Sequence, residues 1–257
     1  MSEFVPASVL ITGASGGIGG ALAEAYAGPG MRLILQGRDE EKLASAAACC
    51  RALGADVRTR VLDLRDRTAL RNWIAQEDAE APVDLLIVNA GVTTNGGPDG
   101  AGERWQAIEE LLEVNVFAAI ASVDAVLPGM RARRRGQIAL ISSLAAYYGL
   151  PVTPSYSASK AALKAYGEGI RGWLAPQGVR VSVVMPGFVE SKMCREFPGP
   201  KPLVWPAARA ARAIQRGLRQ NRARISFPFP LNLGSWSLAV LPAGVSERLL
   251  ALLRYRG

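Results

Sequence analysis

Short apolar segments recur from residue 8 to residue 186, and stretches with a helical pattern separate them. Several segments are hydrophobic at nearly every position rather than at alternate ones, which is typical of strands buried on both faces of a parallel sheet. The predicted strands are 8–12, 32–36, 57–64, 83–90, 136–143 and 179–186, with a last strand at 223–227. The intervening stretches, rich in Ala, Leu and Glu, predict helices over 17–28, 39–53, 66–80, 103–131 and 155–175.

This alternation predicts an α/β fold, a Rossmann-like, doubly wound parallel sheet with helices on both faces. No linker, charge block or internal repeat divides the 257 residues, so we expect one domain over 1–257. Ligands of such sheets bind where the strands end at their carboxyl side, and we expect the chemistry there.

The composition removes several kinds of chemistry. The chain has no histidine, no CxxC pair and three cysteines, Cys49, Cys50 and Cys194. A Ser-His-Asp hydrolase is therefore excluded, and we expect no metal site because the common zinc ligand sets are missing. Without a signal-peptide pattern or a disulfide framework, we expect a cytoplasmic protein.

The formal charge is +8, with arginine clusters at 131–136 and 216–224. Such clusters are usually solvated helix ends, and no nucleic-acid-binding motif accompanies them. We therefore expect no nucleic-acid partner.

A glycine-rich loop, TGASGGIGG at 12–20, joins the first strand to the first helix. Glycines there allow a tight turn and close approach to a pyrophosphate, and the helix N-terminus offers free N–H groups. The spacing of Gly13, Gly17 and Gly19 differs from G-x-G-x-x-G. The loop predicts a dinucleotide site, with a plain turn as the alternative.

The end of the second strand bears on which dinucleotide binds. An acid there would hold a free 2′-hydroxyl, whereas a 2′-phosphate requires a guanidinium. The chain has Gln36, Gly37 and Arg38 at this point, and Asp39 is interpreted as the N-cap of the next helix. NADP(H) is therefore favoured over NAD(H).

The stretch SYSASK places Tyr156 and Lys160 one helical turn apart. An ammonium beside a phenol favours the phenolate, so Tyr156 can act as a proton donor and acceptor near neutral pH. Ser143, at the end of the fifth strand, can hydrogen-bond the same substrate oxygen. Its neighbour Ser142 would point to the opposite face. A solvent-facing Tyr–Lys pair is the alternative.

Residues 7–192 resemble the classical short-chain dehydrogenases/reductases. The loop at 12–19 is similar to the family's TGxxxGxG, NAG at 89–91 and PG at 186–187 match family motifs, and Tyr156 to Lys160 reads YxxxK. Ser143 precedes Tyr156 at the family spacing.

The resemblance implies four catalytic residues, Asn115, Ser143, Tyr156 and Lys160, of which Ser143 and Tyr156 also contact the substrate. It implies that Asp63 meets the adenine amino group, that Lys160 binds the nicotinamide ribose, and that Asn115 holds a water that relays protons to Lys160. The cofactor contacts that it implies are Gly13, Ser15, Gly17, Ile18, Gly19, Arg38, Asp63, Leu64, Asn89, Ala90, Gly91, Tyr156, Lys160, Pro186, Gly187, Val189 and Ser191.

The resemblance ends before the C-terminus, and we interpret 188–257 as a substrate lid with an apolar extension of the same domain. No charged residue lies between Arg224 and Glu247, but the prolines and glycine of this segment argue against a regular membrane-spanning helix. A lid over a lipophilic substrate, a subunit interface and a peripheral membrane contact through 225–257 all remain open.

The resulting hypothesis is an NADP(H)-dependent oxidoreductase that moves hydride between the nicotinamide and a ketone or secondary alcohol on an apolar substrate. The resemblance implies a homodimer or homotetramer, built through 103–131 and 155–175. A 3-oxoacyl-[acyl-carrier-protein] reductase and a non-catalytic, dinucleotide-sensing interaction protein are the alternatives.

Overall fold

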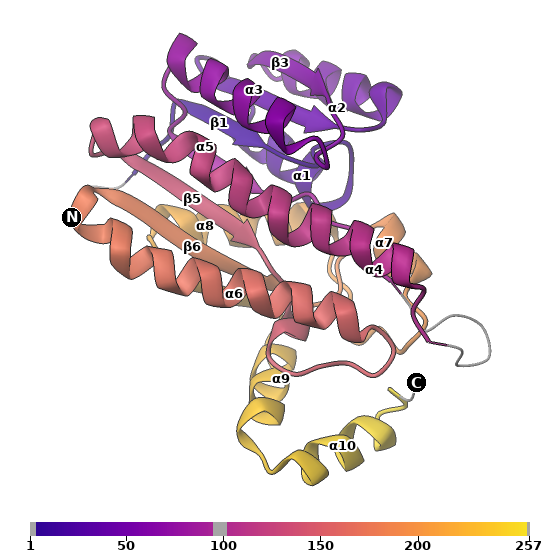
Figure 1. Ribbon diagram of the computed structural model, residues 1–257. Coiled ribbons are helices and arrows are strands. Elements are labelled where there is room, and N and C mark those ends of the chain that lie inside the picture. Colours follow the sequence, from indigo (N-terminus) through magenta and orange to yellow (C-terminus); the bar gives the residue numbers. More distant parts are fainter. Residues whose placement is uncertain (1–3, 95–101, 256–257) are drawn as a thin grey trace.

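A seven-stranded parallel sheet forms the centre of the computed structural model, which describes residues 4–94 and 102–255 (Figure 1). The strand order is β3-β2-β1-β4-β5-β6-β7, and both neighbours of β1 pair with it in parallel. The strands are β1 (Ser8–Ile11), β2 (Arg32–Gly37), β3 (Asp56–Val61), β4 (Leu85–Val88), β5 (Gly136–Ile141), β6 (Val179–Pro186) and β7 (Arg224–Phe227). The doubly wound prediction is confirmed, although β3 and β4 are shorter than the apolar pattern indicated.

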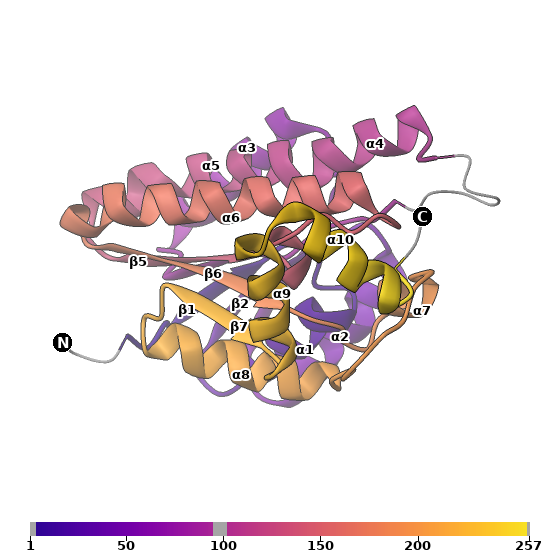
Figure 2. The ribbon, with the colours of Figure 1, turned by 90° about the horizontal axis from the view of Figure 1, so that it is seen from below.

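Helices cover both faces of the sheet (Figure 2). One face carries α1 (Gly17–Tyr26), α2 (Glu40–Ala52) and α8 (Ala207–Arg219), and the other carries α3 (Arg67–Glu80), α5 (Ala118–Ala132) and α6 (Pro154–Leu174). The shorter α4 (Trp105–Leu112) leads into α5 through a π-helical turn, η2 (Glu113–Phe117).

Two apolar cores follow from the alternation of side chains along the buried strands. In β1, Val9 and Ile11 face the helices α1, α2 and α8, whereas Leu10 faces the opposite layer. All three residues are completely buried, as the continuous apolar pattern predicted.

The helical stretch Trp105–Ala132 is, within the part of the chain that the structure describes, the one segment with the length and apolar content of a membrane span. Its second half contacts α3 and contributes buried residues such as Val123 and Val126 to the core. Packing on the sheet accounts for its apolar character.

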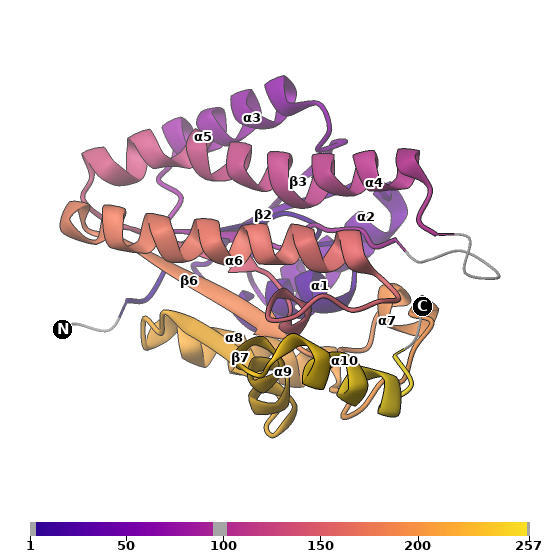
Figure 3. The ribbon, with the colours of Figure 1, turned by 60° about the horizontal axis from the view of Figure 1, so that its bottom comes forward.

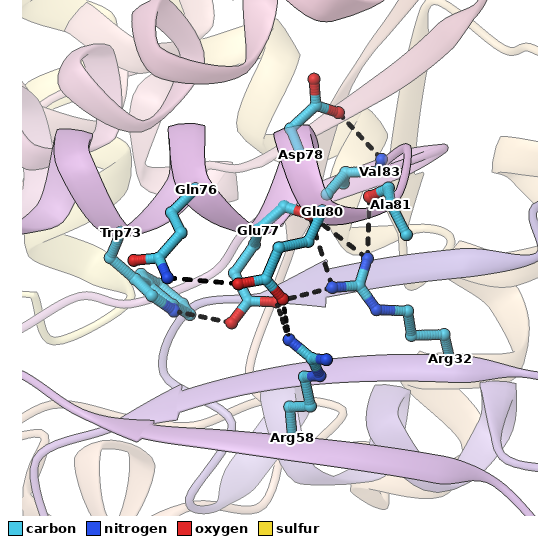
Figure 4. A network of polar contacts seen from close by, with 9 residues as sticks. All are labelled: Arg32, Arg58, Trp73, Gln76, Glu77, Asp78, Glu80, Ala81 and Val83. Atoms are coloured by element: carbon cyan, nitrogen blue, oxygen red, sulfur yellow. Dashed lines mark hydrogen bonds and ion pairs between the residues drawn. The ribbon is translucent and has the colours of Figure 1, made fainter.

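A network of charged side chains fastens α3 to the amino ends of β2 and β3 (Figure 4). Arg32 Nη2 lies 2.7 Å from Glu77 Oε2, and Arg32 Nη1 donates to the Ala81 carbonyl at 2.8 Å. Arg58 pairs with both Glu77 and Glu80. Because this network lies at the edge opposite the carboxyl ends of the strands, we assign it a structural role.

The C-terminal part contains helices that the apolar pattern did not predict: α7 (Lys192–Glu196), α8, α9 (Leu231–Val240) and α10 (Ala243–Leu252). Pro230 and Pro242 immediately precede α9 and α10, so the prolines divide the segment into two short helices. These helices fold back beside the loop that leads into α6 (Figure 3).

Candidate active site

The glycine loop leaves open space at the N-terminus of α1. Gly13 and Gly17 have φ values of +68° and +55°, and a Cβ on Gly19 would lie 2.2 Å from the Gly13 carbonyl oxygen. Gly16 is the N-cap, and no side chain caps the helix there. A Cβ on Gly16 would meet no atom within 4 Å. An anion can therefore approach the first-turn N–H groups, as a dinucleotide pyrophosphate requires.

Polar side chains hold this loop from two neighbouring strands. The Thr12 hydroxyl accepts from the backbone N–H of Asn89 at 3.1 Å and of Ala90 at 3.2 Å, while the Asn89 amide donates to the Gly13 carbonyl at 2.9 Å. The buried Gln36 accepts from the Gly13 N–H at 3.0 Å and donates to the Leu62 carbonyl at 2.6 Å. These roles of Thr12 and Gln36 were not predicted from the sequence, because their hydrogen-bond partners are distant along the chain.

The carboxyl end of β2 holds no carboxylate on the loop side. A Cβ on Gly37 would lie 3.1 Å from Ser15 Cβ, so Ser15 fills the space there. Arg38 is exposed, with its Nη1 3.4 Å from Glu110 Oε1. Asp39 caps α2 by accepting from the Lys42 N–H at 3.1 Å, as predicted. An exposed guanidinium beside a serine fits a 2′-phosphate.

Asp63, the predicted adenine contact, binds Arg65 through its carboxylate, with Arg65 Nε 2.9 Å from Oδ2. The Arg65 hydrogen bond is the main cause of a lowered pKa of the Asp63 carboxyl, and the charge of Arg38 also lowers it. Leu64 beside it is buried.

The loop after β6 comes close to the glycine loop. A Cβ on Gly17 would lie 3.2 Å from Ser191 Cβ, and Ser191 caps α7 by accepting from the Cys194 N–H at 3.0 Å. Gly187 packs tightly, since a Cβ there would lie 3.0 Å from Pro228 Cδ. The loop after β6 therefore lies beside the glycine loop. It is placed to cover a ligand that binds there.

Ser143, Tyr156 and Lys160 come together at the carboxyl end of β5. Ser143 lies just beyond the strand and caps the 3₁₀ turn η3 (Leu144–Ala146), and its hydroxyl is close enough to Tyr156 to lower the pKa of the phenol. Lys160 is buried, and its Nζ donates to the Ile141 carbonyl at 3.0 Å. Nζ lies 5.7 Å from the centre of the Tyr156 ring.

Ser142 makes its side-chain hydrogen bond away from Tyr156. Its hydroxyl donates to the Lys160 carbonyl at 2.7 Å, and the residue is buried. Of the two neighbouring serines, the structure therefore brings Ser143, and not Ser142, to the tyrosine.

The pKa shifts correct one expectation. Desolvation raises the pKa of the Tyr156 phenol and outweighs the hydrogen bond to Ser143, which lowers it. Burial also lowers the pKa of Lys160 to about 8. Burial thus holds the phenol in its protonated form, and the shift of its pKa is opposite to the one that a neighbouring ammonium would give.

Asn115 lies fully buried in the π-helical turn η2. Its amide donates to the Val92 carbonyl at 2.9 Å and to the Ser159 hydroxyl at 3.0 Å, and its oxygen accepts from the Val92 N–H at 2.8 Å. Both N–H groups of the side chain are used, so the implied water relay cannot depend on them. The side chain instead fixes the segment after β4 against α6.

Gly91 lies between Asn115 and Lys160, and both side chains approach it closely because it has no side chain of its own. A Cβ on this glycine would lie 3.2 Å from Asn115 Oδ1 and 3.3 Å from Lys160 Nζ. Close packing at this point holds the buried ammonium at the end of the sheet.

Glu103 is a site residue that the sequence analysis missed. Its carboxylate accepts from the Ser155 N–H at 3.1 Å and from the Ser155 hydroxyl at 2.6 Å, and it also contacts the Thr94 hydroxyl. The N-cap residue of α6, Thr153, makes no such bond with its own side chain. Because Glu103 precedes a different helix, no local sequence signal connects it to α6.

The C-terminal helices pack on the segment between Ser143 and Tyr156. Leu231 at the start of α9 joins Leu144 in one apolar cluster, and Leu250 of α10 joins Val152 in another. A cavity of about 400 Å³ lies between α10 and this segment. Its lining is Tyr148, Gly149, Leu150, Pro151, Pro154, Glu247, Leu250, Ala251 and Tyr255.

Comparison with known proteins agrees with this geometry. Residues 7–200 match the family described as short chain dehydrogenase. An oxidoreductase from Myxococcus xanthus is 36% identical over 244 residues, covering 94% of this chain and 95% of that protein. The ketoacyl reductase HetN from Nostoc is 34% identical over 190 residues, which are 74% of this chain and 66% of that protein.

A solved structure is also similar over nearly the whole chain. The short-chain dehydrogenase from Sphingobium yanoikuyae in complex with NADPH has a TM-score of 0.78 and 26% identity, with 95% of each chain covered. This coverage extends the similarity beyond residue 200, where the match to the family description ends.

Proposed function

We propose, from the premise that the chain belongs to the short-chain dehydrogenase family and is an NAD(P)-dependent oxidoreductase, that it reduces ketones on apolar substrates with NADPH and catalyses the reverse oxidation of secondary alcohols. The observation that carries this proposal is the placement of Ser143 and Tyr156 beside the buried Lys160, at the sheet edge where the glycine loop lies.

Bound NADP(H) would supply or accept the hydride. Tyr156 donates its proton to the carbonyl oxygen during reduction and takes it back during oxidation, and Ser143 donates a hydrogen bond to the same oxygen. A raised pKa keeps Tyr156 protonated at neutral pH, which suits the reductive direction. The Lys160 ammonium holds the ribose hydroxyls and orients the tyrosine.

The NADP(H) preference is proposed from Arg38 and Ser15 at the end of β2, because the strand ends in Gln36 and Gly37 and not in an acid that would hold a free 2′-hydroxyl. Support comes from the NADPH complex of the Sphingobium yanoikuyae dehydrogenase.

The position of the C-terminal helices is the basis for proposing an apolar substrate. Leu231, Leu250 and Tyr255 pack on the residues that connect Ser143 with Tyr156, so the C-terminal helices act as the lid of the substrate site. The cavity beneath α10 has aromatic and aliphatic lining beside a single charged residue, Glu247.

A 3-oxoacyl chain on an acidic carrier protein is the second candidate substrate. The similarity to a ketoacyl reductase favours it, and the net charge of +8 would attract such a carrier. A panel that contains both simple ketones and a carrier-bound 3-oxoacyl chain separates the two candidates.

Replacement of the proposed proton donor tests the mechanism. We expect Tyr156→Phe to lower kcat by about 10³-fold or more, because removal of a general acid typically costs 10²–10⁴-fold. NADPH binding, followed by fluorescence titration, should stay within about threefold of wild type. Tyr166→Phe in the same helix is the matched control and should retain activity. Equal turnover by Tyr156→Phe and wild type would refute the role.

The cofactor preference is tested separately by Arg38→Ala. Loss of the guanidinium should weaken 2′,5′-ADP binding by about tenfold or more and leave 5′-AMP binding nearly unchanged in calorimetric titrations. Arg212→Ala, on the exposed surface of α8, is the control. A similar loss for both nucleotides would contradict the phosphate role.

A further inference from the structure

The helices α9 and α10 carry large apolar side chains on their solvent-exposed faces. In α9, Leu233, Trp236 and Val240 are 53%, 45% and 60% exposed, and their spacing puts them on one face of the helix. No residue of α9 is buried. An apolar face turned toward solvent is the reverse of the usual arrangement in a surface helix.

The pattern continues in α10. Val245, Leu249 and Leu252 are 41%, 37% and 77% exposed and again share one face. We call the exposed apolar side chains of this region the tail patch. Its residues are Phe229, Leu233, Trp236, Val240, Leu241, Val245, Leu249, Leu252 and Leu253.

Polar side chains of the same segment face the protein. Ser246 is completely buried and donates to the Leu238 carbonyl at 2.8 Å. Asn232 is partly buried and donates to the Ser226 carbonyl at 3.3 Å. The segment thus places these two polar side chains on the protein side together with Leu231 and Leu250, while the apolar side chains of the tail patch face outward, which is stable where the outer medium is itself apolar.

The charges next to the tail patch are mainly positive. Arg248 and Arg254 are exposed and make no ion pair with any residue in 4–94 or 102–255. Glu247 is the one acid from residue 225 to the C-terminus, and the chain as a whole carries +8. A basic border around an apolar face is complementary to anionic lipid headgroups over acyl chains.

We propose that the tail patch docks the protein peripherally on the surface of an anionic phospholipid bilayer. Trp236 and the leucines enter the headgroup–acyl boundary, and Arg248 and Arg254 contact phosphates. A second copy of this chain is a poorer occupant, because a two-fold contact would bring the arginines of both copies together with only Glu247 to neutralise them. This docking is independent of the hydride chemistry proposed above.

Vesicle cosedimentation of the full chain tests the proposal. With phosphatidylcholine vesicles that contain phosphatidylglycerol, we expect wild-type protein to sediment and its intrinsic tryptophan fluorescence, to which Trp236 contributes, to shift to shorter wavelength. The triple variant Leu233→Ser/Trp236→Gln/Leu249→Gln should bind at least about tenfold more weakly, because each side chain loses its burial in lipid. The double variant Arg248→Gln/Arg254→Gln should bind several-fold more weakly, and added salt should affect its binding less than that of wild type.

Leu53→Gln, which removes an exposed leucine at the end of α2, is the matched control and should bind like wild type. Because all altered side chains are exposed, circular dichroism melting should confirm that the variants are folded. Failure of wild type to bind anionic vesicles, or equal binding by the triple variant, would overturn the proposal. So would a tail-patch homodimer in solution that does not bind vesicles.

Discussion

Lys160 carries its ammonium group into the protein interior, where only 4% of the residue is exposed. Burial disfavours the charged form and lowers the pKa from 10.5 to about 8. Between these two pH values the unfolded chain holds a proton that the folded chain has released. The free energy of unfolding therefore rises with pH across this window. A residue that we propose binds the cofactor thus lowers the stability of the fold at neutral pH.

We expect Lys160→Met to remove this pH dependence. Between about pH 8 and pH 9.5, urea unfolding of wild type should gain about 2 kcal/mol relative to the variant, because each pH unit contributes about 1.4 kcal/mol. Lys164→Met, one turn further along α6, should keep the wild-type dependence. Parallel curves for wild type and Lys160→Met would show that the lysine is not desolvated as described.

Single residues were predictable where their meaning lies in local spacing. The positions of Ser143, Tyr156 and Lys160 along the chain were enough to bring them together as a candidate site, because a strand end and one helical turn fix their separation. Gln36 and Asn115 show what local spacing cannot predict. Their hydrogen-bond partners are distant in sequence, so side-chain geometry alone revealed that Gln36 holds the glycine loop and that Asn115 supports Val92.

The helix α6 carries both Tyr156 and Lys160, and its first turn is fixed from outside the helix. Glu103 accepts from the Ser155 N–H and hydroxyl, next to Tyr156. A carboxylate at this position also interacts favourably with the positive end of the helix dipole. Glu103 therefore both stabilises α6 and positions Tyr156, the proposed proton donor.

Replacement of Glu103 by glutamine should affect stability and turnover together. We expect a loss of about 1 kcal/mol in the free energy of unfolding and a fall in kcat of several-fold, with little change in NADPH affinity. Glu109→Gln, at an exposed position in α4, is the control and should change neither quantity. A stability loss without any change in kcat would assign Glu103 a purely structural role.

At the scale of elements, the sheet and its covering helices followed from apolar periodicity. The helices α9 and α10 did not, because Pro230 and Pro242 break their segment into pieces too short for a sustained pattern. The outward-facing apolar side chains of α9 also defeat a reading that assigns apolar residues to the core.

Besides the tail patch, the protein exposes a second group of large side chains. These are aromatic, and they are distant from the tail patch in the sequence. Trp105, Phe117 and Trp173 are 65%, 51% and 53% exposed. They lie on α4, η2 and α6, the helices through which we predict a homodimer or homotetramer. Large exposed aromatics are typical of subunit interfaces.

We expect light scattering after gel filtration to give the mass of a dimer or tetramer. Trp173→Glu should shift the protein toward a smaller species, because a carboxylate cannot be buried unpaired in such an interface. Trp236→Glu in the tail patch should leave the oligomeric state unchanged. A wild-type monomer would refute the assembly, and dissociation by the tail-patch variant alone would move the interface to the C-terminus.

The close approach of Gly37 to Ser15 limits how the cofactor preference can be changed, by evolution or by protein engineering. An aspartate at position 37 would place its Cβ 3.1 Å from Ser15 Cβ, closer than nearly all ordinary contacts. Single replacement of Gly37 would therefore strain the loop before its carboxylate could reach a ribose. Shortening Ser15 to glycine would remove this contact, so packing favours making that substitution before the one at Gly37.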